Sequence, residues 1–387
     1  MKQPAKRVMT MSPFLVVQIL TRARSLERAG YKVIHMEAGE PNLPLPLPVQ
    51  EALRQAASQP MGYTEAGGML ALRERIAAFY ANQFGVTVDA RRIFLTTGVS
   101  SALLMLLASI ADSGEKVLIP DPGYPCYRQL LNFLGIIPEV LPLAAKRGYL
   151  PDIAQIQQVG TQAKALILAS PANPTGVIMP SNRLGEILAI CQAMDLFVIM
   201  DEIYAPLTFD EKPQTVLALN DEALVVSGFS KYFGMTGLRL GWAIVPEFLL
   251  GPLETIAQNL YIAPPTPAQY AAMAAFLPET LDELEKRKKS FQARRDFLVA
   301  NLQAIGFKVP VLPDGGFYIY ADASAFTHDS LAFCHDILEK VHVAITPGED
   351  FGSYDTKTKV RFSFTAPLDD LQEGIARLKR YLNQYLS

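Results

Sequence analysis

The chain has 387 residues, half of them hydrophobic and 19% charged, and its net charge at pH 7 is −3. This length exceeds one simple hydrophobic core, so we expect one large domain and one smaller domain. The near-neutral charge lacks the basic excess of proteins that bind nucleic acids or anionic membranes, so neither is expected as a partner.

The first residues predict an amphipathic helix rather than a signal peptide. Ser12 suits an N-cap and Pro13 the first helical position, and apolar residues at helical spacing follow until Gly30. Charged residues stand where a signal peptide needs a small-residue cleavage site. A short apolar strand is expected at 33–36, and the proline-rich stretch 41–48 is expected to connect two domains. No apolar run reaches the roughly 18 residues of a membrane span.

From about residue 48, helical patterns alternate with short apolar runs. This alternation predicts an α/β fold, with a mostly parallel sheet sandwiched by helices. The expected strands are 93–95, 116–119, 165–168, 196–200 and 223–226. The expected helices are about 48–58, 69–83 and 100–111.

The remainder of the chain predicts a second, α+β domain. A charged helical segment at 277–302 leads into strands at 316–320 and 359–364 and helices at about 329–340 and 368–385. We expect the large domain at 46–280. The small domain then consists of 1–45 together with 281–387.

The residues that follow these strands are suited to ligand chemistry, because α/β proteins bind ligands at the carboxyl ends of their strands. In chain order they are the small residues 96–101, which include Val99 and Ser100, then Tyr124, Asn173, Asp201 with Tyr204, and Ser230 with Lys231.

Each of these residues also has an explanation without a ligand. A helix start rich in small residues binds anions such as phosphate, yet the same residues serve as an ordinary N-cap. Tyr124 is suited to stack on a planar ligand or to pack within its own loop. Asp201 follows five apolar residues, where a carboxylate is costly to bury without a cation. A lysine at position 231 becomes a nucleophile if apolar surroundings favour its neutral form, whereas a surface lysine after a core strand has the same spacing.

Two arginines, Arg239 and Arg361, add fixed cations to this set. The whole set suits a planar, phosphorylated, carbonyl-bearing cofactor with a basic ring nitrogen. Pyridoxal phosphate has these properties, with a lysine for its aldehyde, an acid for its ring nitrogen and cations for its phosphate.

Three segments in this order give the chain a specific resemblance: Asn-Pro-Thr-Gly at 173–176, Asp-Glu-Ile-Tyr at 201–204, and Ser-Lys at 230–231 followed by Gly-Leu-Arg at 237–239. The chain resembles the class I/II aminotransferases, which are pyridoxal-phosphate enzymes of fold type I, from Ser12 to Arg361. The resemblance implies transfer of an amino group between an L-amino acid and a 2-oxo acid by a ping-pong mechanism, in amino-acid metabolism. It also implies a homodimer with shared active sites, and the three scattered cysteines fit a reducing, cytoplasmic location.

The resemblance gives the central residues their expected roles. Lys231 resembles the Schiff-base lysine that also shuttles the proton. Asp201 would keep the pyridine nitrogen protonated, and Asn173 and Tyr204 would hydrogen-bond the ring 3-oxygen. Tyr124 would stack on the ring.

The same resemblance implies residues for the phosphate group and for the neighbouring subunit. Arg239 would hold the phosphate together with Val99 and Ser100 at their helix start. Tyr63 resembles the tyrosine that reaches the phosphate of the neighbouring subunit.

Arg361 is expected to bind the substrate α-carboxylate as a bidentate pair, helped by the backbone of Gly39 and by Asn173. The side-chain specificity is less determined. Arg22 and Arg24 are candidates for binding a second carboxylate or are solvated helix residues. The apolar stretch 261–265 favours neutral or aromatic substrates.

The chain departs from the family pattern at two positions. Gly228 stands where many relatives carry a hydroxyl residue, which leaves open whether Ser227 or Ser230 contacts the phosphate. Asn42 stands where aspartate is more usual.

Two other functions are compatible with parts of this pattern. A lyase that eliminates the β-substituent of a sulfur-containing amino acid would use the same residues. A non-catalytic regulator that binds the cofactor is disfavoured, because too few residues precede the main domain for a DNA-binding domain.

A metal site is not expected. His328, His335 and His342 are roughly 10 Å apart per step on a helix, too far to share one ion. Three scattered cysteines form neither a CxxC motif nor a disulfide framework. Dinucleotide-binding, P-loop, HExxH and GxSxG motifs do not occur.

Overall fold

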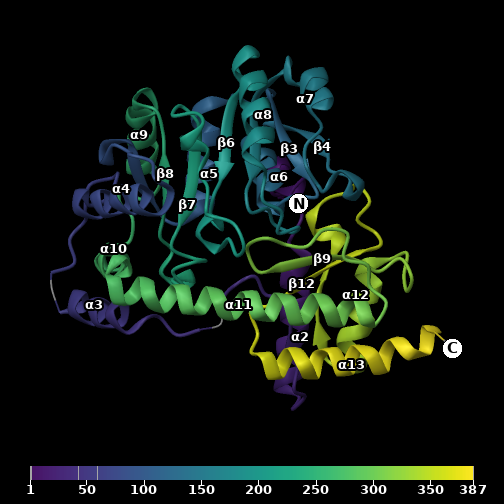
Figure 1. Ribbon diagram of the computed structural model, residues 1–387. Helices are drawn as coiled ribbons and strands as arrows, with labels where there is room; N and C mark the ends of the chain where they lie inside the picture. The colour runs from purple at the N-terminus through teal and green to yellow at the C-terminus, as the bar shows by residue number, and fades with distance from the viewer. Residues whose placement is uncertain (1, 42, 59, 387) are drawn as a thin grey trace.

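A twisted seven-stranded sheet forms the centre of the larger part of the molecule (Figure 1). The computed structural model describes residues 2–41, 43–58 and 60–386, so Asn42 lies outside the described residues. The strand order is β2-β8-β7-β6-β5-β3-β4. The strands are β2 (Ile93–Thr96), β3 (Lys116–Asp121), β4 (Ile137–Pro142), β5 (Ala163–Ala169), β6 (Phe197–Asp201), β7 (Leu224–Gly228) and β8 (Gly241–Ile244).

Only β8 runs against its neighbours in this sheet, and the pairs among β3, β4, β5, β6 and β7 are parallel. The predicted mostly parallel sheet is therefore confirmed. The sequence pattern does not predict β4 and β8. β4 is a half-exposed edge strand without a continuous apolar run, and the short β8 follows the loop that contains Lys231.

Helices cover both faces of the sheet because successive strand residues point to opposite sides. In β7, Leu224 and Val226 pack with residues of α5, α6 and α9, whereas Val225 packs with residues of α4, α8 and α10. These helices are α3 (Leu47–Ala57), α4 (Leu70–Phe84), α5 (Val99–Ile110), α6 (Pro125–Leu134), α7 (Ile153–Gly160), α8 (Ser181–Ala193), α9 (Leu250–Leu260) and α10 (Thr266–Met273).

The second part of the molecule contains a small antiparallel sheet of β11 (Thr346–Pro347), β12 (Lys359–Ser363) and β9 (Tyr318–Asp322). β1 (Ile34–His35) pairs in parallel with β10 (Val343–Ala344), which brings the N-terminal segment to the C-terminal part. The long helix α11 (Pro278–Ala304) runs along both parts (Figure 1). The remaining α-helices are α1 (Lys6–Met9), α2 (Leu15–Arg28), α12 (Ser330–Val341) and α13 (Leu368–Leu386). The division of the chain at residues 45/46 and 280/281 stays a prediction.

Short 3-10 helices complete the described elements: η1 (Ala90–Arg92), η2 (Ala145–Arg147), η3 (Ala205–Leu207), η4 (Val216–Ala218), η5 (Thr236–Leu238), η6 (Glu247–Leu249), η7 (Ala274–Phe276) and η8 (Gly348–Phe351). Within the described ranges, no helix has the length and apolar character needed to cross a membrane. Across the same residues, no three or more His, Cys, Asp or Glu side chains are grouped so that they could hold a metal ion.

The prediction of the first long helix is wrong at its start. Ser12 is not the N-cap, because α2 begins at Leu15. The backbone N–H groups of Leu15 and Val16 instead donate to the Asp350 carboxylate, at 2.6 and 3.4 Å. A carboxylate far along the chain therefore satisfies the helix start, and no local sequence pattern indicates such a partner.

Candidate active site

A cavity of about 260 Å³ opens at the carboxyl ends of the parallel strands, where the N-terminal segment and the small antiparallel sheet meet the large sheet. The predicted site residues that line it are Gly39, Val99, Ser100, Tyr124, Asn173, Asp201, Tyr204, Ser230, Lys231, Arg239 and Arg361. Tyr63 does not line it, and its side chain is 80% exposed. The structure thus brings together all the predicted site residues except the one expected to act in a neighbouring subunit.

Lys231 lies just beyond the end of β7, with its amine directed across the cavity. Its Nζ donates a hydrogen bond to the Gly39 carbonyl at 2.6 Å and lies 5.9 Å from the centre of the Tyr204 ring. These contacts hold the amine inside the cavity, and no carboxylate of the described part of the chain forms an ion pair with it, so a ligand can compete for the amine.

Asp201 is the last residue of β6, and its carboxylate is almost fully buried. Oδ2 accepts from the Tyr127 hydroxyl at 2.7 Å, and Oδ1 accepts from the Ile203 backbone N–H at 3.1 Å. Burial raises the pKa of Asp201 to about 6, against these two hydrogen bonds and the charge of Lys231, which lower it. Neither hydrogen-bond partner is charged, so the carboxylate is prepared to pair with a cation that enters the cavity.

An anion cradle lies at the start of α5, beside Arg239. Gly98 precedes this helix with φ of 88°, and a Cβ placed there would lie 2.6 Å from Arg239 Nη2. Only glycine therefore lets the guanidinium approach the helix start, where Val99 and Ser100 present the first backbone N–H groups. A helix N-terminus beside an arginine is a favourable site for a phosphate group.

The two serines near the lysine differ in where they point. The Ser227 hydroxyl is buried and donates to the Glu202 carbonyl at 3.2 Å, away from the cavity, whereas Ser230 lines the cavity. A side chain at Gly228 has no room, because its Cβ would lie 2.9 Å from the Gly241 Cα. Of the two serines that the sequence left open, Ser230 lines the cavity and Ser227 does not.

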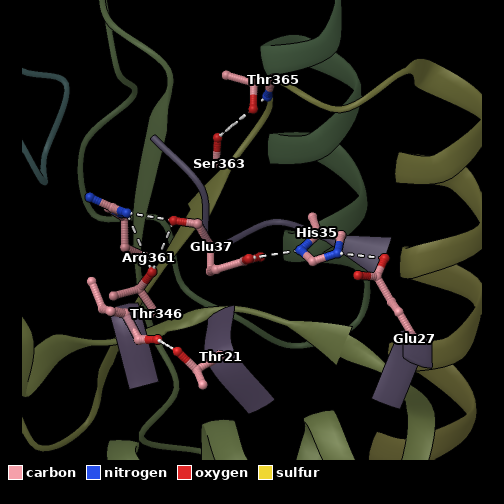
Figure 2. A network of polar contacts seen from close by, with 9 residues as sticks. Thr21, Glu27, His35, Glu37, Thr346, Arg361, Ser363 and Thr365 are labelled. Atoms are coloured by element: carbon pink, nitrogen blue, oxygen red, sulfur yellow. Dashed lines mark hydrogen bonds and ion pairs between the residues drawn. The ribbon is translucent and has the colours of Figure 1, made fainter. Parts of the chain in front are cut away.

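Arg361 lies in the middle of β12 and is almost fully buried. Nη1 donates to Asn173 Oδ1 at 3.0 Å, and Nη2 donates to the Glu37 carbonyl at 2.7 Å (Figure 2). The guanidinium also lies 4.0 Å from the centre of the Tyr318 ring and 4.8 Å from that of Phe351. No carboxylate among the described residues pairs with it, so this buried cation suits a carboxylate of a ligand.

Several residues that line the cavity were not predicted as site residues from the sequence: Phe14, Val16, Tyr127, Thr236 and Tyr318. Tyr318 belongs to β9, where its apolar neighbours made it look like a core residue. Its hydroxyl hydrogen-bonds the Tyr204 hydroxyl at 2.9 Å, and a Cβ on Gly39 would lie 2.0 Å from it. No local signal identifies it, but the glycine at position 39 is explained by this close approach.

Comparison with known proteins identifies the family. The family profile described as aminotransferase class I and II matches residues 31–378. The chain belongs to the class I and II aminotransferases. It is a pyridoxal-phosphate-dependent aminotransferase, which moves an amino group between an amino acid and a 2-oxo acid.

Relatives of this aminotransferase are similar over nearly their full length. It is 37% identical to the valine–pyruvate aminotransferase of Mycobacterium tuberculosis, covering 96% of each chain. It is 32% identical to the (5-formylfuran-3-yl)methyl phosphate transaminase of Methanocaldococcus jannaschii, covering 98% of this chain and 100% of the other. The crystal structure of an aminotransferase from Mycobacterium tuberculosis superposes with a TM-score of 0.96 at 36% identity, covering 99% and 100%. The fold type I assignment is therefore confirmed, whereas the substrates named for the two relatives differ from each other.

The cavity of this aminotransferase fits pyridoxal phosphate on its own geometry. The buried Asp201 carboxylate offers a partner to the ring nitrogen, and the Arg239 cradle offers one to the phosphate. Lys231 lines the same cavity and offers an amine to the aldehyde. The donor and acceptor types match the cofactor at each of its three polar ends.

Proposed function

We propose that this aminotransferase takes a small, neutral, apolar L-amino acid such as valine as amino donor and a short 2-oxo acid such as pyruvate as acceptor. The main support for this proposal is the number of positively charged residues that line the cavity. Of the described residues that line the cavity, Lys231, Arg239 and Arg361 carry a positive charge. The cofactor aldehyde, the cofactor phosphate and the substrate α-carboxylate use all three, so the described residues that line the cavity within one subunit leave no cation for the second carboxylate of an acidic substrate.

The surroundings of the substrate side chain support the same choice. Phe14 and Val16, at the start of α2, and the ring of Tyr124 give this end of the cavity an apolar lining. The two arginines that could have served an acidic substrate lie elsewhere. Arg22 pairs with Glu339, Arg24 is exposed, and neither lines the cavity.

The residues act on the substrate as follows. Arg361 binds the α-carboxylate through its planar guanidinium, and its aromatic neighbours exclude water from this contact. Asn173 fixes the outer side of the guanidinium. With the carboxylate held there, the Lys231 amine would take up the Cα proton as a general base.

The residues around the ring hold the charges that this proton transfer requires. Pyridoxal phosphate, when bound, supplies an aldehyde for the amino group and a ring that withdraws the electron pair from Cα. Asp201 would pair with the ring nitrogen and stabilise a proton there. Asn173 and Tyr204 would hydrogen-bond the 3-oxygen, Tyr124 would cover one ring face, and Ser230 would join Arg239, Val99 and Ser100 at the phosphate.

A panel of amino donors tests this specificity. With pyruvate as acceptor, kcat/KM for valine is expected to exceed that for aspartate and glutamate by roughly a hundredfold, because an unpaired carboxylate must otherwise be desolvated. Preference for an acidic donor would overturn the proposal. Formation of pyruvate and ammonia from a β-substituted donor without any acceptor would instead indicate the lyase reaction.

We also propose that the enzyme is a cytoplasmic homodimer with shared active sites. Met61 and Tyr63 are exposed, and so are Leu260 and Ile262. The two segments lie side by side, because Thr266 Oγ1 donates to the Gly62 carbonyl at 2.8 Å. Sedimentation of the purified enzyme is expected to give twice the monomer mass. Mutation of Tyr63 to Phe is expected to weaken cofactor binding without changing the fold, and a monomeric active enzyme would refute the proposal.

A further inference from the structure

We propose that His35 and Glu37 form a charge pair that positions Arg361 for the substrate carboxylate. Figure 2 shows the pair between α2 and the strand that carries Arg361. The inference rests on the proposed role of Arg361 and adds two residues that do not touch the cavity. His35 and Glu37 are positioning residues, which act through the backbone that Arg361 binds.

The Glu37 carboxylate is the unusual feature. The residue is completely buried, and Oε1 accepts from His35 Nδ1 at 2.8 Å. Among the residues that the structure describes, Oε2 has no hydrogen-bond partner. A buried carboxylate is costly unless it is paired with a cation. The pairing with His35 is therefore the main compensation that the described residues offer.

The geometry also defines the protonation state of His35. Nδ1 faces Glu37, and Nε2 lies 3.1 Å from Glu27 Oε1 (Figure 2). Carboxylates accept hydrogen bonds, so both ring nitrogens must donate, and only the imidazolium form can do so. In agreement, the hydrogen bond to Glu37 raises the pKa of His35 to about 9, against the opposing effect of burial.

Glu37 connects this pair directly to the substrate-binding arginine. Its backbone carbonyl accepts from Arg361 Nη2 at 2.7 Å and from Thr346 Oγ1 at 3.3 Å. One residue thus holds the imidazolium with its side chain and the guanidinium with its backbone. We therefore expect a displacement of the Glu37 side chain to reach the carbonyl that orients Arg361.

The backbone around Glu37 is held by further hydrogen bonds. We therefore expect a displacement of Glu37 to reach neighbouring residues of this segment. The Met36 N–H donates to the Ala344 carbonyl at 2.9 Å, and the Met36 carbonyl accepts from the Ser363 N–H at 2.6 Å. Two residues after Glu37, the Gly39 carbonyl accepts from Lys231 Nζ. The segment 35–39 therefore joins the charge pair to both ends of the substrate site.

The other charged groups of the packed elements are engaged with different partners. On α13, Asp370 pairs with Lys32, and Arg377 pairs with Glu373 and with backbone carbonyls near β1 and β10. His342, which precedes β10, contacts the Leu338 carbonyl. Among the described residues, Glu27 from α2 and Glu37 from the segment after β1 are the charged groups in contact with His35.

The consequence is a pH-dependent affinity for the substrate carboxylate. Below pH about 9 the imidazolium compensates Glu37 and the carbonyl stays in place. Loss of the His35 proton removes the cation beside the buried Glu37 carboxylate and leaves at most a neutral N–H hydrogen bond, so we expect this segment to move. Carboxylate binding then weakens, whereas residues that act on the ring and the Cα proton are not displaced.

The test measures binding of 3-methylbutanoate, a carboxylate without an amino group, to the holoenzyme between pH 7 and 10.5. Its inhibition constant and the shift of melting temperature that it causes give two independent readouts. In the natural enzyme we expect binding to weaken by roughly tenfold above pH 9, because small misplacement of a binding group has effects of this size. A pH-independent affinity would overturn the proposal.

Variants separate this proposal from other titrations. Glu37→Gln, which forms a neutral hydrogen bond with neutral histidine, is expected to give a flat pH profile. His35→Arg, with a fixed charge, is expected to retain tight binding at pH 10. Asp370→Asn removes a nearby exposed ion pair and serves as the matched control, with the natural profile. If Glu37→Gln and His35→Arg both bind 3-methylbutanoate more weakly at alkaline pH, as the natural enzyme does, the inference is wrong.

Arg361→Lys distinguishes failure of the inference from failure of the proposed function. If this variant binds 3-methylbutanoate normally, Arg361 does not bind the carboxylate and the proposed function fails. If it binds weakly while the variants of His35 and Glu37 behave like the natural enzyme, only the inference fails. Circular dichroism spectra confirm folding, and His35→Gln, which is expected to bind weakly at every pH, is the milder alternative if Glu37→Gln does not fold.

Discussion

Asp201 and Arg361 are both buried ionisable groups without an oppositely charged hydrogen-bond partner, but the protein treats them differently. Asp201 lies at the end of β6 and can reduce its cost by binding a proton, which is why burial raises its pKa to about 6. Arg361 cannot give up its proton. Its charge is instead surrounded by the Glu37 carbonyl, the Asn173 amide oxygen and the face of Tyr318.

The two ends of the cavity are therefore built for their ligands in different ways. The cofactor end uses residues at the ends of neighbouring strands β5, β6 and β7, which the sheet holds at fixed spacing. The substrate end joins segments that are far apart in the chain, so its geometry depends on their packing. Mutations at the first end should abolish chemistry, and mutations at the second should alter binding.

The largest effect is expected for Lys231→Ala. Without the amine that bonds the cofactor and moves the Cα proton, turnover should fall by at least about 10⁴-fold. Steady-state rates and the absorbance of the bound cofactor measure this loss. Lys164→Ala, which removes an exposed lysine outside the cavity, is the control. Normal turnover in the Lys231 variant would contradict the role of the cofactor end.

Asp201→Asn is expected to change catalytic activity and folding stability in opposite directions. Activity should fall by roughly 10³-fold, because the ring nitrogen loses its carboxylate. The cofactor-free protein should become more stable at pH 7, by up to on the order of 3 kcal/mol, since the variant no longer buries a carboxylate whose pKa is raised from 3.8 to about 6.

The sign of the pH dependence follows from the same shift. A raised carboxyl pKa means that the folded protein binds the proton more tightly than the unfolded chain, so the contribution of Asp201 to stability falls as pH rises from about 4 to about 6. Denaturant unfolding of the cofactor-free protein at several pH values measures the difference from the variant. An equal stability at pH 7 would show that the carboxylate costs nothing.

Arg361→Lys should affect the substrate end alone. We expect kcat/KM to fall by roughly a hundredfold, because lysine lacks the planar fork and the stacking on Tyr318. Cofactor affinity should stay unchanged, as measured by titration of the cofactor-free enzyme. If cofactor affinity falls together with kcat/KM, the cofactor end and the substrate end of the cavity are not independent.

The smallest effect is expected for Tyr318→Phe. This variant keeps the ring beside Arg361 and removes the hydrogen bond to Tyr204, whose net contribution is about 1 kcal/mol. A several-fold loss of kcat/KM is expected from steady-state kinetics with valine and pyruvate. A loss as large as that of Arg361→Lys would place the tyrosine hydroxyl at the centre of substrate binding.

The sequence by itself determined the type of fold and much of the cofactor end. Asp201 ends the apolar strand β6, Lys231 lies shortly after β7, and Asn173 lies shortly after β5. Such signals are local, because a buried strand and the polar residue that ends it are neighbours in the chain. Parallel pairing then brings the strand ends to one edge of the sheet.

Only the tertiary structure decided the rest. Asp350 caps α2 from the other end of the chain, Tyr127 supports Asp201, and Gly241 leaves no room for a side chain at Gly228. His35 and Glu37 are two residues apart in sequence, yet their connection to Arg361 exists only because Glu37 packs against β12. Hydrophobic periodicity and turn sterics act between near neighbours, whereas these contacts depend on how distant segments pack.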